Sequence, residues 1–474
     1  MNSKTAIVWF RRDLRLHDNP AFKYAADSNY RIYPLFIFDT KSDQKWMIGD
    51  AAKWWLSKSL TSLNSSLSGN LNLKSGDPLE VLRQLVRVTE NCEAIFWNRC
   101  YEPWQISRDI VIKKQLLLEK MIVKSFNGTL LFEPQKVQKK DGTPYKVFTP
   151  FFKKGCLENA TQPELPSGPP PEYLLCKKPN SAGELTNFFK IEKWHKKFTN
   201  LWEPGEQGAI IKFESFLKQG IEGYQEGRNC PSLQNVSRLS PHLHFGEISV
   251  NRIWHAIRNS DIDCKNMDHS TFLTELGWRE FSYNLLFFNP DMPENNLQKK
   301  FDNFPWNRNH AMLRNWQVGS TGYPIVDAGM RQLWQTGYMH NRLRMITGSF
   351  LVKNLLLDWR LGQSWFWNCL FDADLANNSA GWQWVAGCGA DAAPFFRIFN
   401  PILQSKKFDP KGAYIKTFVP ELAKLPIKYI HCPWEAPITI LKEAGVEIGV
   451  NYPGRIVDLS ATRNEALSAY QMIK

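Results

Sequence analysis

The sequence lacks the patterns that mark several large classes of protein. Its nine cysteines form no CxxC pair and show no metal-ligand spacing, so neither a disulfide framework nor a structural metal site is expected. The first thirteen residues contain no apolar segment of the signal-peptide kind, and no apolar run is long enough to cross a membrane. We therefore expect a cytoplasmic protein with reduced thiols and no membrane association.

Familiar catalytic motifs are also missing. There is no GxGxxG dinucleotide fingerprint, no GxxxxGK[ST] phosphate loop, and no Ser–His–Asp or Cys–His pattern. Neither nucleotide binding by those two loops nor catalysis by an activated covalent nucleophile finds support in the sequence.

The composition points to a folded protein with a polyanionic partner. Hydrophobic residues make up 43% of the 474 residues, which is enough for two domains with sizeable cores. The formal net charge is +13 and the pI is near 9.2. Such a balance favours nucleic acid as the partner, although many soluble proteins are basic for no specific reason.

The first third of the chain alternates apolar runs with helix-period segments. Buried strands are expected at Ala6–Phe10, Ile32–Phe38 and Ala94–Trp97, and helices at 51–67 and 77–89. Strand–helix alternation of this kind predicts a doubly wound parallel sheet with helices on both faces. We assign residues 1–132 to this α/β domain.

The rest of the chain lacks this alternation of strands and helices. Residues 133–205 contain the run PSGPPPEY and several lysine pairs, which indicates a linker. From residue 206 to 474 the pattern is all-α, with helices expected at 213–226, 271–288, 324–335, 341–359 and 364–370. No internal repeat is visible, and nothing suggests more than a monomer.

Two polar segments could bind a ligand, and each has an ordinary alternative. In NVSRLSPHLHFG (235–246), Ser237, Arg238 and Ser240 precede a helix start and could hold phosphate oxygens, or could simply cap the helix. In TELGWREFSYNLLFF (274–288), Glu275 and Arg279 share a helix face beside Trp278. They could line a base-sized pocket or form a surface ion pair of a few tenths of a kcal/mol.

Two further segments carry a stronger signal. In GYMHNRLRMITGSFL (337–351), Asn341, Arg344 and Met345 share one helix face and suit a heteroaromatic ligand with polar edges. In the segment 370–404, the acids of DAD, two asparagines and WQW are crowded together. Exposed loops rarely carry such tryptophans, so a ligand-binding backbone packed against aromatics is favoured. Most of the 19 tryptophans are expected to fill the core.

These motifs carry a family resemblance. WFRRDLRLHDNP (9–20), SRLSPHLHFGEIS (237–249), TGYPIVDAGMRQL (321–333), HNRLRM (340–345) and DADLANNSAGWQW resemble the photolyase/cryptochrome family nearly end to end. Within the family, the sequence is similar to the bacterial class I-type enzymes for cyclobutane pyrimidine dimers. The resemblance implies an N-terminal antenna-binding domain and a helical domain that binds FAD beneath a cavity for a flipped dimer.

The resemblance also implies roles for individual residues. FAD would be bound by Tyr224, Val236, Ser237, Arg238, Leu239, Ser240, Arg279, Asn341, Arg344, Asp372, Ala373, Asp374 and Asn378. The dimer and DNA would be contacted by Arg228, Glu275, Trp278, Asn341, Arg342, Met345, Trp384 and Gln404. Trp382, Trp359 and Trp306 would relay electrons to the flavin. Glu102 matches an acid that contacts a folate antenna, so the second chromophore is expected to be a reduced folate such as methenyltetrahydrofolate, or a deazaflavin.

By the same resemblance, the activity is light-driven dimer repair, in which excited reduced FAD gives an electron to the dimer. Asn378, expected opposite flavin N5, is an amide where plant receptors of the family have an acid and animal-type cryptochromes a thiol. Asn341 stands where enzymes for 6–4 photoproducts have the second histidine of a pair, so cyclobutane dimers are favoured. The alternatives are a cryptochrome photoreceptor, a cryptochrome that repairs single strands, and a plain flavin electron-transfer module.

Overall fold

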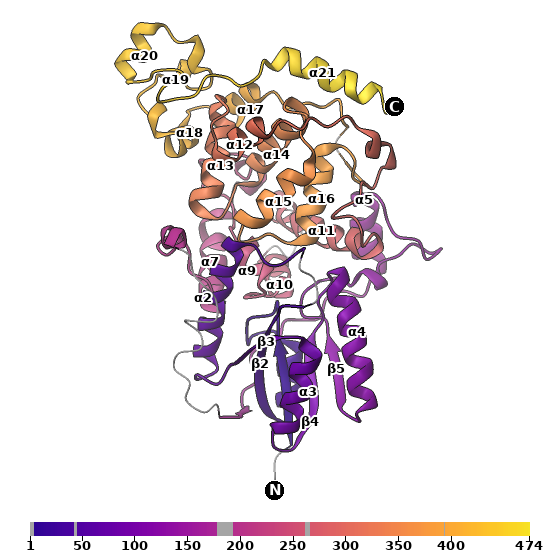
Figure 1. Cartoon of the computed structure of the whole chain (residues 1–474). Coiled ribbons are helices and arrows are strands. Elements are labelled where there is room, and N and C mark those ends of the chain that lie inside the picture. The colour runs from indigo at the N-terminus through magenta and orange to yellow at the C-terminus, as the bar shows by residue number, and fades with distance from the viewer. Residues whose placement is uncertain (1–3, 42–44, 178–192, 261–265, 393) are drawn as a thin grey trace. The chain divides into compact units, whose positions relative to one another are not determined.

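The computed structural model describes residues 4–41, 45–177, 193–260, 266–392 and 394–474. The chain separates into two compact units (Figure 1). Unit 1 comprises Met1–Gln219 and Ser237–Pro290, and unit 2 comprises Gly220–Val236 and Asp291–Lys474. This partition differs from boundaries at residues 132 and 205, because Glu206, Phe245 and Glu280 accept hydrogen bonds from backbone N–H groups of the sheet-bearing part of the chain.

Unit 1 is built on a parallel sheet with the strand order β3-β2-β1-β4-β5, and with β6 paired to β2. The strands are β1 Thr5–Phe10, β2 Arg31–Asp39, β3 Asn72–Gly76, β4 Cys92–Asn98, β5 Ile122–Phe126 and β6 Leu174–Leu175. In the central pair, Trp9 of β1 lies opposite Trp97 of β4. The order reverses between β1 and β4, which is where doubly wound sheets open a crevice at the carboxyl ends of the strands.

The two faces of the sheet are covered by different helices. The helices are α1 Pro20–Asp27, α2 Asp50–Ser66, α3 Pro78–Val88 and α4 Pro103–Leu118. Alternate residues of a strand point to opposite faces, so Trp9 and Trp97 pack with Leu82 of α3 and Leu116 of α4. On the other face, Phe10 packs on Phe22 of α1. The doubly wound parallel architecture expected from the sequence is confirmed.

The second part of unit 1 adds short segments and helices to this sheet. They are α5 Phe148–Pro150 with the π-helical segment η2 Phe151–Asn159, α7 Glu206–Ser215, α9 Ser240–His244, α10 Val250–Ser260 and α11 Met267–Phe288. Segments far apart in the sequence are joined here, for Leu14 N donates to the carbonyl of Phe245 at 3.1 Å.

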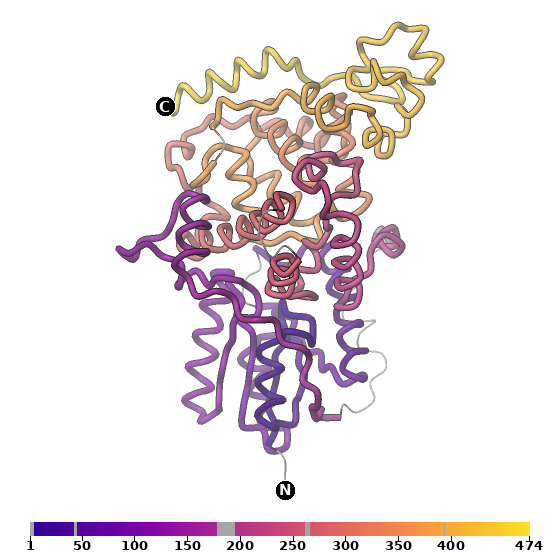
Figure 2. The backbone as a smooth tube through the Cα atoms, turned by 180° about the vertical axis from the view of Figure 1, so that it is seen from behind, coloured from indigo at the N-terminus to yellow at the C-terminus, as the bar shows by residue number. Residues whose placement is uncertain are grey.

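Unit 2 is helical, as the tube in Figure 2 shows for its orange and yellow parts. Its helices are α8 Tyr224–Gly227, α12 His310–Val318, α13 Pro324–Thr336, α14 Asn341–Ser349, α15 Trp359–Cys369, α16 Leu375–Ala386, α17 Pro401–Phe408, α18 Ala413–Phe418, α19 Ile427–Ile430, α20 Ile438–Ala444 and α21 Leu459–Gln471. Large side chains such as Trp316, Trp359 and Phe371 fill the core. The all-α prediction for this part is confirmed.

Several expected elements differ in detail. The helix predicted at 341–359 is wrong as one element: α14 passes into the π-helical turn η6 (Phe350–Asn354) and ends, and α15 begins at Trp359. Leu356, whose φ is 51°, interrupts the helix, and Asp358 caps α15 by accepting from the backbone N–H of Arg360 at 2.9 Å. The helix predicted at 213–226 is likewise divided among α7, η4 (Phe216–Gly220) and α8. In the described residues, no helix has the length and apolar character needed to span a bilayer, and no cluster of acids, histidines and cysteines suits a metal ion.

Glu247 ties the later segments of unit 1 to α2. Its buried carboxylate accepts from Trp55 Nε1 at 3.0 Å, from the backbone N–H of Gly205 at 2.7 Å and from Ser59 Oγ, and it contacts His242 Nδ1 at 2.5 Å. These partners come from three places in the sequence: helix α2, Gly205 and His242. Such a buried network is costly to break, because each partner would lose its hydrogen bond away from water.

We therefore expect Glu247→Ala to lower the free energy of unfolding of unit 1 by about 3 kcal/mol. Urea unfolding at equal cofactor content measures this change. Glu93→Ala is the matched control, since its partly exposed ion pair with Lys4 contributes less than about 1 kcal/mol. Equal losses in the two variants would contradict the role given to Glu247.

Candidate functional site

The polar residues of α14 are held by neighbours in unit 2. Arg344 donates from Nη2 to both oxygens of Asp372, at 2.8 and 3.0 Å, and from Nε to the carbonyl of Met339 at 2.8 Å. A two-oxygen contact of this kind fixes the guanidinium plane. Asn341 is exposed at the start of the same helix, and His340 Nδ1 accepts from the backbone N–H of Arg342 at 3.2 Å. The structure thus brings Arg344 and Asp372 together.

The start of α16 orients Asn378. Asp374 caps this helix by accepting from Asn377 N at 2.9 Å and from Asn377 Nδ2 at 2.7 Å, and Ala373 beside it is buried. One turn later, Asn378 Nδ2 donates to the carbonyl of Gln363 on α15 at 3.1 Å. Because the amide nitrogen is engaged in this way, the half-buried side chain presents its Oδ1 as a hydrogen-bond acceptor.

The three tryptophans expected to relay electrons all lie in unit 2. Trp382 of α16 lies directly over Gly362 of α15, since a Cβ built on that glycine would come within 2.1 Å of the indole ring. Trp359 is fully buried at the start of α15, and its Nε1 donates to Asn296 at 3.0 Å. Trp306 is half-exposed, and its neighbour Asn307 forms a bridge with Leu357, two residues before Trp359. The series therefore runs from two buried rings to one at the surface.

Several residues expected to contact DNA also gather in unit 2. Arg342 donates to Asn229 Oδ1, beside Arg228, and to Met345 Sδ at 3.6 Å. Its guanidinium also lies 4.3 Å from the ring centre of Phe408, one turn from Gln404 on α17. Arg228 lies over the ring of the buried Tyr224 at 5.6 Å. Trp384 is half-buried on α16.

In unit 1, Arg238 of the segment expected to bind phosphate interacts electrostatically with a second cation, Lys212 of α7. Arg238 is exposed with a φ of 51°, between the half-buried Ser237 and the buried Leu239, and Ser240 begins α9. Burial lowers the pKa of Lys212 on α7, and the positive charge of Arg238 lowers it further. Adjacent cations with hydroxyl neighbours suit the pyrophosphate of a dinucleotide such as FAD. Val236, which precedes Ser237 in the sequence, is the last residue of the first segment of unit 2.

Helix α11 places Trp278 against Phe148, a ring that lies outside the motifs described above. Trp278 stacks on Phe148, with ring centres 3.8 Å apart and planes inclined by 9°. Arg279 turns to Glu280, at 2.7 Å, and to the carbonyl of Thr129, at 3.0 Å, with its guanidinium 5.1 Å from the Tyr283 ring. Glu275 is half-buried on the same helix. Phe148 lies 130 residues away in sequence, so no local pattern could have identified the stack.

Glu102, the expected antenna contact, lies at the N-cap of α4, four residues after the carboxyl end of β4. Glu102 is buried at the start of α4 and pairs with Arg12 Nη1 at 2.6 Å. Nearby, the guanidinium groups of Arg11 and Arg108 lie 4.7 and 5.1 Å from the centre of the Trp9 ring. The buried Nε1 atoms of Trp9 and Trp97 and the buried Oε1 of Gln105 have no hydrogen-bond partner among the described residues. Buried polar atoms without partners are uncommon and favour a ligand site.

Comparison with known proteins agrees with this arrangement. A family model described as the FAD binding domain of DNA photolyase matches residues 272–472, and one described as DNA photolyase matches residues 6–171. The whole chain is 47% identical to the deoxyribodipyrimidine photo-lyase of Agrobacterium fabrum, over 99% of that protein. It is also 37% identical to cryptochrome-2 of Arabidopsis thaliana, with 98% of this chain matching 78% of that protein.

Solved structures give the same result. A bacterial class III photolyase from Agrobacterium tumefaciens matches with a TM-score of 0.94 and 46% identity, over 100% of this chain and 98% of that one. A cryptochrome from Synechocystis matches with a TM-score of 0.88 and 29% identity, over 99% of this chain and 100% of that one. The sequence predicted similarity to class I-type enzymes, whereas the matching structure from Agrobacterium tumefaciens is a class III photolyase.

Residues 272–472 thus form an FAD-binding domain of the photolyase type, and residues 6–171 form the accompanying α/β domain. The full-length enzyme relatives include deoxyribodipyrimidine photo-lyases from three bacteria: Agrobacterium fabrum, Alkalihalophilus pseudofirmus and Escherichia coli. These similarities show that the chain belongs to the photolyase/cryptochrome family, with the deoxyribodipyrimidine photo-lyases as its enzyme relatives.

Proposed function

We propose that this protein repairs cyclobutane pyrimidine dimers in DNA, using blue light absorbed by bound reduced FAD. The observation that carries the proposal is the orientation of Asn378, whose Nδ2 is engaged by the Gln363 carbonyl. Its Oδ1 can accept a hydrogen bond from N5–H of a reduced flavin, and an amide supplies no proton in return. A site of this kind favours a flavin kept in its reduced form, which repair requires.

When bound, reduced FAD would supply the electron that opens the dimer, and the protein would contribute binding, orientation and electrostatics. The Lys212–Arg238 pair would hold the phosphates, and Arg344, fixed by Asp372, would present its guanidinium to the flavin and ribose. Asp374 would act through α16, by capping the helix that carries Asn378.

The dimer is proposed to enter its site flipped out of the DNA, as bases do in enzymes that act on them directly. Trp278, held flat by Phe148, would stack on the dimer, because base–aromatic stacking contributes about 1–3 kcal/mol per base. Glu275 and Asn341 would hydrogen-bond the carbonyl edges, with Trp384 and Met345 as apolar contacts. Arg228, Arg342 and Gln404 would contact the DNA strand. The neutral amide of Asn341 favours cyclobutane dimers over 6–4 photoproducts.

A second chromophore is proposed for the crevice between β1 and β4. The buried Arg12–Glu102 pair and the unsatisfied Nε1 atoms of Trp9 and Trp97 would provide polar contacts to a heteroaromatic molecule. A reduced folate or a deazaflavin has the required aromatic rings and polar edges.

A photoreceptor role is the second candidate, favoured by the 36–37% identity to the two cryptochromes of Arabidopsis thaliana. It shares the fold and the FAD, but requires no activity on DNA. Repair is the better-supported function because of the amide at Asn378, and because a charge of +13 suits a DNA partner.

The direct test illuminates the photoreduced protein with an oligonucleotide that contains one thymine cyclobutane dimer. We expect the absorbance of the restored thymines to rise in blue light and to stay constant in darkness. A strand carrying a 6–4 photoproduct is the control and should remain unrepaired. Tight FAD binding without repair of either strand would contradict the proposal and favour the photoreceptor role.

Substitution of Trp306 should affect photoreduction of the flavin without affecting repair of the dimer. We expect Trp306→Phe to slow photoreduction of the oxidised protein at least about tenfold, because phenylalanine is much harder to oxidise and Trp306 is the ring nearest solvent in the series. Repair by chemically reduced protein should be unchanged. Photoreduction is followed by visible absorption under blue light with an external reductant.

The matched control is Trp434→Phe, since Trp434 is half-buried against Tyr323 and Arg455, away from the relay residues in sequence. A rate of photoreduction equal to that of this control would exclude Trp306 from the relay.

A further inference from the structure

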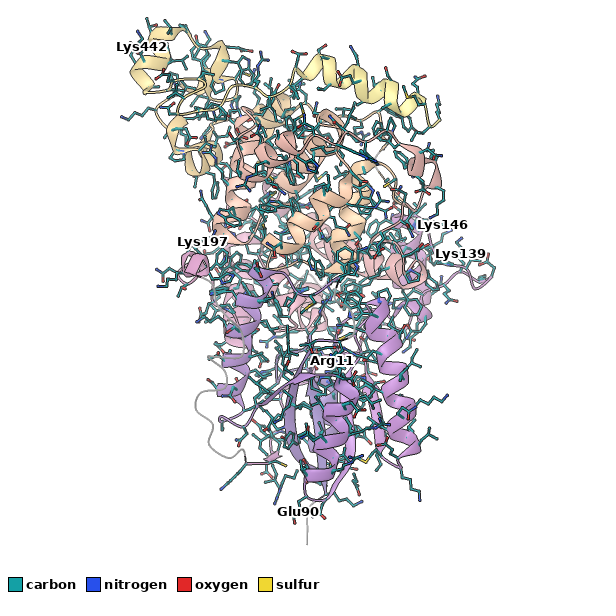
Figure 3. All side chains as sticks on the ribbon, viewed as in Figure 1. Arg11, Glu90, Lys139, Lys146, Lys197 and Lys442 are labelled. Carbon is teal, nitrogen blue, oxygen red and sulfur yellow. The ribbon has the colours of Figure 1, made fainter. Side chains whose placement is uncertain are left out.

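Unit 1 carries a basic segment whose lysines the site described above does not use. We name residues 138–154 the lysine arm. Its exposed cations are Lys139, Lys140, Lys146, Lys153 and Lys154, and its turn residues 140–143 are exposed as well. In the described part of the chain, no carboxylate forms an ion pair with any of these five lysines. Lys139 and Lys146 lie on the loop that projects beside α5 (Figure 3).

The lysine arm is folded. Lys139 N donates to the Thr143 carbonyl at 3.0 Å, and Gly142 N donates to the Lys139 carbonyl at 2.9 Å. The one acid of the turn, Asp141, accepts from the Thr143 hydroxyl at 2.7 Å and from its backbone N–H at 2.9 Å, and these bonds lower the pKa of Asp141. The carboxylate therefore serves the turn and makes no ion pair with the lysines.

The base of the lysine arm is packed tightly. Val137 and Tyr145 are buried on either side of the turn, and a Cβ built on Gly155 would come within 2.8 Å of Val137 and 3.0 Å of Tyr145. Gly155 thus allows η2 to press against both ends of the loop. The backbone that carries Lys139, Lys140 and Lys146 is held in one place, although the lysine side chains remain in water.

The lysine arm leads directly into the ring that backs Trp278. Lys146 stands two residues before Phe148, which stacks on Trp278 at 3.8 Å and on Phe152 at 5.6 Å, with planes inclined by 9° and 13°. Gly277 lets Phe152 approach α11, since a Cβ there would lie 2.6 Å from the Phe152 ring. The three parallel rings set the position of the arm relative to the half-buried indole of Trp278, and all of these residues belong to unit 1.

An aromatic platform on a segment rich in exposed cations is the combination that nucleic-acid surfaces use. The ring stacks on a base and the cations contact the phosphates, without reading the sequence. Lysine suits this task because its charge sits on a flexible chain that can follow the backbone. Duplex DNA presents a charge every 1.7 Å along its axis, so several lysines can be engaged at once.

We propose that the lysine arm binds the phosphate backbone of duplex DNA beside the flipped dimer, with Phe148 as the positioning residue that joins the arm to Trp278. The inference rests on the proposed function for the location of the dimer. It adds a phosphate-binding surface within residues 133–205, whose composition indicates a linker.

The test measures binding of a dimer-containing duplex at several salt concentrations, using the full-length FAD-loaded protein. In the variant Lys139→Ala/Lys140→Ala/Lys146→Ala, the slope of log affinity against log salt should become shallower by about one for each lysine removed. Affinity at low salt should fall roughly tenfold or more. The control variant, Lys58→Ala/Lys74→Ala/Lys114→Ala, removes the same charge from exposed positions elsewhere in unit 1 and should change the slope much less.

Substrate length separates phosphate binding from a structural effect. A dimer-containing dinucleotide has no flanking phosphates, so the arm variant should bind and repair it as the unchanged protein does. Equal weakening for the dinucleotide and the duplex, or a slope equal to that of the control variant, would overturn the proposal.

The same data distinguish failure of the lysine arm from failure of the proposed function. Light-driven repair by the unchanged protein, together with an unaltered salt slope in the arm variant, would reject the arm and leave repair standing. Absence of repair, together with a shallower slope for duplex DNA, would reject the repair function and leave the arm as a DNA-binding surface.

Discussion

The close contact between α15 and α16 is the constraint on which the helical unit depends. Trp382 lies over the bare backbone of Gly362, and it packs edge-on against Trp316 and Phe366. A side chain on Gly362 would force the helices apart, because the indole ring already occupies that space. The glycine therefore allows an approach that larger residues would prevent.

Two features of the proposed flavin site follow from this contact. Gln363, the next residue along α15, accepts from Asn378 at 3.1 Å and donates to Ser379 at 2.8 Å, so the amide proposed to face the flavin is oriented by the same pair of helices. Trp359 begins α15 one turn before Gly362, so the same helix carries one proposed relay ring, Trp359, and contacts the other buried one, Trp382. One packing arrangement thus places both the group that would tune the flavin and the rings that would reduce it.

In the sheet-bearing unit, the buried strands could be predicted from the sequence, but the contacts between distant residues could not. Strands β1, β2 and β4 could be predicted because they are continuous apolar runs, whereas β3 (NLKSG) and β5 (IVKSF) could not, because they lie toward the sheet edges and are partly exposed. The i, i+4 spacing of Glu275 and Arg279 left a surface ion pair and a base-sized pocket as alternatives, and it could not show that Arg279 binds Glu280 and the Thr129 carbonyl. The stack of Phe148 on Trp278 joins residues that no periodicity relates.

The site itself was accessible from sequence mainly through long motifs. The motifs around Asn341, Asp372 and Asn378 identified the family, but spacing alone left a capped helix or a surface ion pair as alternatives. It could not show that Asp374 caps α16, that Asn378 Nδ2 binds Gln363, or that the pair Lys139–Lys140 lies on a folded turn. These features depend on where distant segments meet, which local pattern does not encode.

The central claim is that the α15–α16 contact sets the geometry in which light drives repair. The most direct measurement is the number of dimers repaired per absorbed photon by Gly362→Ala, compared with Gly381→Ala on α16, where a Cβ would meet nothing within 4 Å. Only FAD-loaded, chemically reduced protein is counted. We expect the yield of Gly362→Ala to fall severalfold and that of Gly381→Ala to match the unchanged protein. Equal yields in the two variants would contradict the account.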